Sequence, residues 1–418
     1  MKRNKTLRVF LTLALALVLC LGTMTTAFAA PGPITGGTET TPAQAVITKT
    51  LQMPDGTATP AETFTFTLAR KSVDGVAYNA TTNPMPAITN KTVAFAATDV
   101  GTTASSIKTV SKETASLFTG IVWPHAGVYT YTVTETAGST AGMTYSSGSY
   151  DISVYVANGT SSLYIAAIGT TVVAVDHTGQ TIGDKTDPTT STTISGASSA
   201  MVFTNTYIQT PTVVNPTLGD ALSVSKTVVG TYGDQSKYFG FTVSLTKAAF
   251  VSGTPTYKVY VMNASNAVVT STDNYATLQP ADTYGVYINV TAGTPITINL
   301  KHGQRLAFMG LPVGTTYSVT EAGTPDYTPS ASVVVNGGVP AVTNGTVSTA
   351  LSIGSPTAII IGANTNSAAY TNTYKTVAPT GISLNNLPFI MMIGLAVIAL
   401  AVFLIVKSRK RAVYGSKH

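Results

Sequence analysis

Residues 129–135 read YTYTVTE, and this stretch decides the fold. Apolar or aromatic side chains alternate with threonine, which is the period of a β-strand with one buried face. Aromatic and β-branched residues also favour strands. The last residue, Glu135, shares a face with Tyr129, Tyr131 and Val133. The stretch therefore predicts a half-buried strand that carries a carboxylate on its apolar face.

The same pattern recurs later in the chain, where residues 317–321 read YSVTE. Around each copy, three further landmarks recur in one order: a lysine strand, an aromatic strand and a closing asparagine strand. These are ITKTL (47–51) and VSKTV (224–228), FTFTL (64–68) and FGFTV (239–243), and FTNTY (203–207) and YTNTY (370–374). An ordered recurrence of this kind indicates two copies of one structural unit.

Short alternating runs bounded by Gly, Asn, Asp and Pro fill both halves, and no stretch before residue 387 sustains a helical apolar period. We therefore predict an all-β protein with two tandem immunoglobulin-like β-sandwich domains. The expected organisation is a signal peptide (1–30), a linker (31–44), domain 1 (45–207), a linker (208–220), domain 2 (221–374), a sorting motif and spacer (375–386), a transmembrane helix (387–406) and a basic cytoplasmic tail (407–418).

The net charge of +6 comes from the two ends of the chain. Of the 23 basic residues, four lie in the first eight positions and five in the last twelve, which leaves 14 against all 17 acidic residues. The middle of the chain is therefore slightly acidic and lacks the basic footprint of a nucleic-acid-binding protein. The scattered His125, His177 and His302 have no metal-ligand spacing, and we expect no cofactor or metal.

The N-terminus has the three parts of a secretory signal. Residues 2–8 are basic, residues 9–21 are apolar, and Ala27-Phe28-Ala29 places small residues where signal peptidase reads. Cleavage after Ala29 or Ala30 would remove Cys20, the single cysteine, and leave a mature chain without disulfides. The alternative is an uncleaved N-terminal anchor.

The C-terminus also has three parts in order. They are Val377-Ala378-Pro379-Thr380-Gly381, an uncharged apolar segment (387–406) and a basic tail. Twenty apolar residues are long enough to span a bilayer, and the basic tail is expected to stay in the cytoplasm. A plain single-span membrane protein is the alternative.

The pentapeptide resembles the LPxTG sorting motif of Gram-positive surface proteins, with Val377 in place of Leu and Ala378 in place of Pro. The resemblance implies that a sortase cuts between Thr380 and Gly381 and passes Thr380 to an amine. The acceptor would belong to peptidoglycan or to another subunit. The mature protein is then expected at the cell surface, covalently attached to the cell wall, after a precursor stage in the plasma membrane.

Each half places a lysine, a glutamate and an asparagine on apolar strand faces. The residues are Lys49, Glu135 and Asn205 in the first half and Lys226, Glu321 and Asn372 in the second. Burial lowers the pKa of a lysine and raises that of a glutamate. A neutral amine can attack an amide carbon while a glutamate moves protons, which would give an amide cross-link and ammonia. An ordinary buried ion pair beside a hydrogen-bonded asparagine is the alternative.

This order of lysine, glutamate and asparagine strands resembles the isopeptide-linkage domains of Gram-positive backbone pilins, which are related to the collagen-adhesin B-type fold. The resemblance covers roughly residues 45–207 and 221–374. It implies Lys49–Asn205 and Lys226–Asn372 bonds, with Glu135 and Glu321 as proton shuttles. It further implies that each bonded pair joins the first strand of its domain to the last.

The leading hypothesis from the sequence is a structural pilus shaft subunit, with no enzymatic activity beyond its own cross-linking. A monomeric wall-anchored adhesin that binds a host or matrix ligand is the alternative. A pilin lysine, the amine that accepts Thr380 of the next subunit, would distinguish the two. The nearest lysine before the asparagine strand of domain 1 is Lys185, in the exposed stretch GDKTDPTTS, and Lys237 and Lys375 are weaker candidates.

Overall fold

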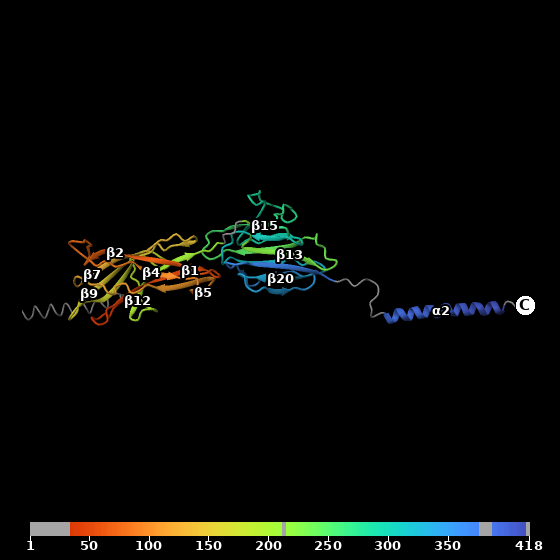
Figure 1. The fold of residues 1–418 in the computed structure, drawn as a ribbon, viewed down its shortest axis with the longest axis horizontal. Helices are drawn as coiled ribbons and strands as arrows, with labels where there is room; N and C mark the ends of the chain where they lie inside the picture. The colour runs from red at the N-terminus through yellow and green to blue at the C-terminus, as the bar shows by residue number, and fades with distance from the viewer. Residues whose placement is uncertain (1–33, 211–214, 376–386, 415–418) are drawn as a thin grey trace, which may run out of the picture.

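The computed structural model describes residues 34–210, 215–375 and 387–414. These parts of the chain consist of β-strands and one C-terminal helix, and the strands gather in two bodies that follow one another (Figure 1). The predicted all-β class with a C-terminal apolar helix is confirmed. The expected leader (1–30) and sorting motif (377–381) lie outside the described residues.

The first body, which we call the first sandwich, contains two sheets. Sheet I has the order β11-β12-β1-β6-β5, with β8 paired to β12. Its strands are β1 (Gln44–Pro54), β5 (Thr102–Ala104), β6 (Ile107–Glu113), β8 (Met143–Thr144), β11 (Thr189–Thr190) and β12 (Ala197–Tyr207). Sheet II has the order β10-β9-β7-β2-β3, with β4 paired to β2. Its strands are β2 (Glu62–Val73), β3 (Val76–Ala77), β4 (Lys91–Phe95), β7 (Gly127–Thr136), β9 (Ser149–Asn158) and β10 (Leu163–Ala174).

The second sandwich also contains two sheets. Sheet III has the order β16-β15-β18-β13-β24-β20-β21. Its strands are β13 (Leu222–Val229), β15 (Thr256–Met262), β16 (Ile288–Thr291), β18 (Arg305–Phe308), β20 (Tyr327–Val334), β21 (Ala341–Asn344) and β24 (Ser367–Tyr374). Sheet IV has the order β17-β14-β19-β22, with β23 paired to β19. Its strands are β14 (Phe239–Thr246), β17 (Ile296–Leu300), β19 (Thr316–Glu321), β22 (Leu351–Ile353) and β23 (Ile359–Ile360).

The alternation in the sequence becomes the inner and outer faces of these sheets. In β7 the tyrosines and Val133 are buried, while the intervening threonines are only partly so. The inner faces of opposed sheets meet through aromatic contacts. Phe66 lies 5.1 Å from Phe203 in the first core, and Phe241 lies 5.2 Å from Tyr370 in the second, between ring centroids. Each sandwich therefore has its own hydrophobic core.

The first and last strands of each sandwich are neighbours and run parallel. In sheet I, Lys49 of β1 is opposite Phe203 of β12, so Asn205 lies two residues further along. In sheet III, Lys226 of β13 is opposite Tyr370 of β24, and Asn372 again lies two residues further along. The offset from lysine to asparagine is thus the same in both sandwiches.

The two sandwiches touch where β1 ends. The backbone N–H of Val313 donates to the carbonyl of Gln209 over 2.8 Å. Gly314 has φ of +85°, and a Cβ at this position would lie 2.2 Å from the Cβ of Pro54. Only glycine allows both this backbone conformation and this close approach. At the other end of the first sandwich, Ile34 pairs with Ile168, so the described part of the expected linker 31–44 begins against β10.

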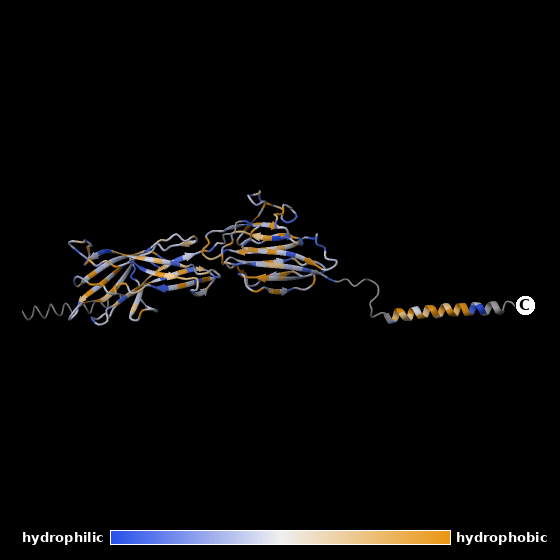
Figure 2. Ribbon diagram, viewed as in Figure 1, coloured by the Kyte–Doolittle hydropathy of each residue, from blue (hydrophilic) through white to orange (hydrophobic). Residues whose placement is uncertain are grey.

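The helix α2 (Leu387–Tyr414) is apolar over most of its length and basic near its end (Figure 2). Its stretch Pro388–Arg409 is long and apolar enough to cross a membrane. The helix predicted over residues 387–406 is therefore present and continues into the basic residues.

One buried tyrosine in each sandwich ties the two sheets together through its hydroxyl. Tyr150 of β9 donates to the carbonyl of Val202 over 2.7 Å, and Tyr370 of β24 donates to the carbonyl of Val319 over 2.7 Å.

Replacing Tyr370 with phenylalanine removes this bond from a buried carbonyl, so we expect Tyr370→Phe to lower the free energy of unfolding by about 1–2 kcal/mol. Urea unfolding measures the change. Tyr232 is 69% exposed, and Tyr232→Phe is the matched control that should change nothing. Equal stability of the two variants would contradict the structural role of this hydroxyl.

Candidate functional site

Lys49, Glu135 and Asn205, which we call the first triad, meet inside the first sandwich. Lys49 and Asn205 come from neighbouring strands of sheet I, and Glu135 comes from β7 of sheet II. The Nζ of Lys49 donates to Oε2 of Glu135 over 2.9 Å, and Nδ2 of Asn205 donates to Oε1 over 2.6 Å. All three side chains are fully buried. One carboxylate therefore holds the amine and the amide together, away from water.

The surroundings of the first triad favour its neutral forms. Burial lowers the pKa of Lys49 to about 8, against the opposing attraction of Glu135. Burial likewise raises the pKa of Glu135, although Lys49 and Asn205 both stabilise its charged form. The other contacts of the amine are the carbonyl of Phe203 at 3.1 Å and the ring of Phe64, whose centroid lies 4.7 Å away. This environment makes the amine a better nucleophile than an exposed lysine.

Lys226, Glu321 and Asn372, the second triad, repeat this arrangement in the second sandwich. Oε1 of Glu321 accepts from Nζ of Lys226 over 2.6 Å and from Nδ2 of Asn372 over 2.7 Å. The three residues are 1–2% exposed. Burial lowers the pKa of Lys226 to about 8 and raises that of Glu321. The ring of Phe239 covers the amine at 4.2 Å.

The two triads differ in what the asparagine carbonyl touches. In the first, Oδ1 of Asn205 accepts the backbone N–H of Ser146 over 2.7 Å. In the second, Oδ1 of Asn372 and Oε2 of Glu321 are both buried without a hydrogen-bond partner. The carboxyl and the asparagine carbonyl of the second triad are therefore less completely hydrogen-bonded than those of the first.

The six lysine, glutamate and asparagine residues that the sequence singled out thus meet as two separate triads, one in each sandwich. Their shared face follows from the strand period, which is why sequence reasoning found them. It did not find Ser146 or the buried Asp176, which accepts hydrogen bonds next to the first triad. Both residues lie on connecting segments, where no periodic pattern marks a position relative to the sheets.

The expected pilin lysine, Lys185, lies on the segment between β10 and β11, ahead of the strand that carries Asn205. It is exposed and pairs with Thr171 at the edge of the first sandwich. Lys237 is also exposed, and Lys375 forms an ion pair with Asp326 at 2.5 Å. The structure therefore places Lys185 on a surface that a second molecule could approach.

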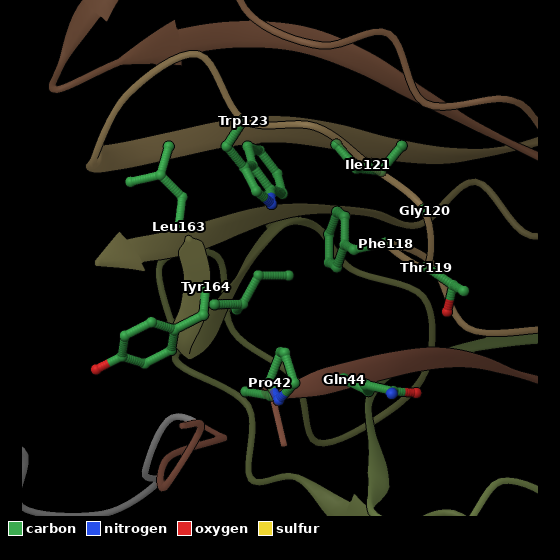
Figure 3. A pocket seen from close by; sticks show the side chains of 11 residues that line it. Pro42, Gln44, Phe118, Thr119, Gly120, Ile121, Trp123, Leu163 and Tyr164 are labelled. Carbon is green, nitrogen blue, oxygen red and sulfur yellow. The ribbon is translucent and has the colours of Figure 1, made fainter. Parts of the chain in front are cut away.

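A cavity of about 240 Å³ lies beside the start of β1, among Phe118, Trp123 and Leu163 (Figure 3). None of the triad residues lines it, so it is separate from the two buried sites. Trp123 is 7% exposed and packs against Tyr129 in the core. Among the described residues, no group of His, Cys, Asp and Glu gathers that could hold a metal ion.

Comparisons with known proteins match each sandwich to a different family model. Residues 45–208 match a model described as a Spy0128-like isopeptide containing domain, and residues 220–374 match one described as a domain of unknown function. The first match confirms, for that part of the chain, the predicted resemblance to isopeptide-linkage domains. No curated protein matches the chain.

Several solved structures are similar at low identity. The major pilin from Streptococcus pyogenes is 21% identical, with 80% of this chain and 99% of that chain covered and a TM-score of 0.31. The major pilin T-13 from Streptococcus pyogenes serotype GAS131465 is 19% identical, with 83% and 100% covered and a TM-score of 0.31. The pilus-presented adhesin Spy0125 (Cpa) is 18% identical, with 55% and 36% covered and a TM-score of 0.24.

The lowered pKa of Lys226 predicts how the stability of the variant Asn372→Ala depends on pH. In this variant Lys226 has no side-chain amide to react with, so it stays a titratable amine beside Glu321. The unfolded lysine titrates at 10.5 and the folded one at about 8, so between these values the unfolded state binds more protons. Stability should therefore rise with pH across this window, by up to about 3 kcal/mol. Urea unfolding at a series of pH values measures this rise.

The matched control is the double variant Lys226→Met, Asn372→Ala. It keeps the other titratable groups of the core, such as the buried tyrosines, but has no lysine at position 226. The difference between the two variants isolates the contribution of Lys226. A difference that is flat with pH, or that falls as pH rises, would contradict the buried environment described for this lysine.

Proposed function

We propose that this protein, whose residues 45–208 match the Spy0128-like isopeptide domain family, is the shaft subunit of a Gram-positive pilus. Its two sandwiches are each locked by a Lys–Asn isopeptide bond that forms without another enzyme. Sortase joins the subunits to one another or to the cell wall. The sandwiches thus have a mechanical role, and the chain belongs to the outer surface of the cell.

The observation that carries this proposal is the repeated buried triad between the first and last strands. A buried lysine and glutamate that served only as an ion pair would cost several kcal/mol of desolvation. The chain bears that cost twice, at equivalent positions and with the same asparagine offset. Formation of a neutral amide removes the buried charges and with them the desolvation penalty. This explains why a lysine and a glutamate are buried at these positions.

The reaction balances within each triad. The lone pair of the neutral Lys49 amine attacks Cγ of Asn205, and the electrons of the carbonyl π bond move to Oδ1. Glu135, which contacts both nitrogens, takes a proton from the amine and delivers it to Nδ2. The Cγ–Nδ2 bond then breaks, ammonia leaves, and the carbonyl re-forms as part of a secondary amide.

The position of the bond explains how it would resist force. β1 is the first long strand of the first sandwich and β12 is the last, and these strands run parallel as neighbours. Tension applied at the two ends would otherwise shear the hydrogen bonds between them. A Lys49–Asn205 bond carries that tension from one strand to the other and leaves the intervening residues unloaded. This role is the one that disulfides fill in many other secreted proteins.

Assembly follows from the expected sorting motif. Sortase would transfer the carbonyl of Thr380 to the amine of a lysine on the next subunit, and Lys185 is our candidate for this amine. The apolar helix α2 would hold the precursor in the membrane until that transfer. An adhesin that is anchored as a monomer would share the anchor but would form no polymer.

The intact mass of residues 31–376 tests the cross-links. Each bond releases one ammonia, so we expect a mass about 34 Da below that calculated from the sequence. In Glu135→Ala or Glu321→Ala, one proton shuttle is missing, and the deficit should shrink to about 17 Da. Mass spectrometry of the denatured protein measures the deficit.

The matched control is Glu39→Ala, which removes a carboxylate that binds the backbone of residues 160–162, away from both triads. This variant should keep the full deficit. A wild-type mass equal to the calculated one would remove the cross-links from the proposal and bring the adhesin alternative forward.

Lys185→Arg tests the assembly step, because an arginine keeps the charge but cannot accept the acyl group. Cells that express this variant should lose the ladder of covalent multimers on a denaturing gel of cell-wall extracts. Lys237→Arg is the control and should leave the ladder intact. A normal ladder from the Lys185 variant would assign the acceptor amine to another lysine.

A further inference from the structure

Ser146 is held beside the reacting amide of the first triad by a segment that the second sandwich lacks. The connection between β7 and β9 spans residues 137–148 and includes β8, which pairs with the end of β12. The corresponding connection after β19 spans only residues 322–326. The longer connection brings the Ser146 N–H to 2.7 Å from Oδ1 of Asn205.

Asp176 fixes this geometry from the other side. Its carboxylate is fully buried and accepts a hydrogen bond from the hydroxyl of Ser146. The same carboxylate accepts the backbone N–H of Thr204 over 2.9 Å, directly before Asn205 in the chain. One side chain therefore anchors both the N–H donor and the strand that carries the acceptor amide. A third contact, to Nδ1 of His177 at 3.0 Å, completes its hydrogen bonding.

The asparagine carbonyl oxygen of the second triad has different surroundings from that of the first. Oδ1 of Asn372 is buried and accepts no hydrogen bond. A backbone nitrogen that donates its hydrogen to a carbonyl oxygen over 2.7 Å lies within the distance range of an oxyanion-stabilising donor. The first triad therefore has a backbone N–H donor at its asparagine carbonyl, and the second triad has none.

We propose that the backbone N–H of Ser146 stabilises the oxyanion formed on Asn205 during cross-linking, and that Asp176 is the positioning residue for this donor. The inference rests on the cross-linking reaction proposed above. As Lys49 attacks, negative charge develops on Oδ1, and the hydrogen bond from Ser146 strengthens. It weakens again when the Cγ–Nδ2 bond breaks and ammonia leaves. Ser146 itself neither gains nor loses a proton.

A time course of cross-linking in the full chain tests this role. The chain is synthesised in a cell-free translation system and quenched in acid at intervals, and the Lys49 and Lys226 peptides are quantified by mass spectrometry after proteolysis. Asp176→Asn keeps an acceptor for Thr204 but loses the carboxylate that orients Ser146. We expect it to slow the Lys49–Asn205 reaction by about tenfold or more. The Lys226–Asn372 reaction in the same molecule should keep its rate.

Two further variants separate positioning from folding. Ser146→Ala retains the N–H but loses the hydroxyl contact, so it should slow the same reaction, and the double variant with Asp176→Asn should be no slower than the slower single one. Asp151→Asn, which removes a carboxylate from the outer face of the same sandwich, should leave both rates unchanged. In every slowed variant the reaction should still reach completion.

The possible failures are distinguishable. If neither peptide of the wild-type chain becomes cross-linked, the proposed function fails and this inference fails with it. If the wild-type chain reacts and Asp176→Asn reacts at the same rate, only the positioning role is wrong. A lower final yield with an unchanged rate would show that Asp176 supports folding instead, and equal slowing of both reactions would exclude a local effect.

Discussion

The buried pair of a lysine and a glutamate is the interaction on which each sandwich depends. Lys49 and Glu135 face one another across the two sheets, without access to water. Attraction between the charges is strong in such a place, but the loss of hydration is at least as large. The pair is therefore tolerable in two ways: as neutral partners that share protons, or as a reacted amide. The aromatic rings of Phe64 and Phe239 lie beside the two amines and help to exclude water from them.

The topology makes the chemistry mechanically useful. Because β1 and β12 are parallel neighbours, the two ends of the chain leave the first sandwich in opposite directions along the same pair of strands. The second sandwich uses β13 and β24 in the same way. A cross-link at this pair lies directly on the path between the termini. The same bond between two strands from the middle of the domain sequence would leave the first and last strands free to separate under tension.

The two sandwiches share a triad but differ in the connections around it. After the glutamate strand, the first sandwich passes through the short β8, which pairs with β12, and then forms β9, which pairs with β7 in sheet II. The second continues into β20, which crosses to sheet III and pairs with β24. The first therefore has a long connection over the asparagine, and the second has a short one. Equivalent strands with unequal connections explain why one asparagine carbonyl has an N–H donor and the other has none.

The sequence by itself determined the strands, the repeat and the six triad residues, because a period of two decides which side chains share a face. Glu135 was assigned to the apolar face from YTYTVTE alone. Local patterns do not encode the pairing of β1 with β12, because strand order depends on long-range contacts; the family resemblance implied that the first and last strands are joined, and the tertiary structure shows them as parallel neighbours. It also decided the place of Ser146 and Asp176, whose roles come from the path of irregular segments. No periodicity constrains such segments, so their contacts arise only when the sheets have packed.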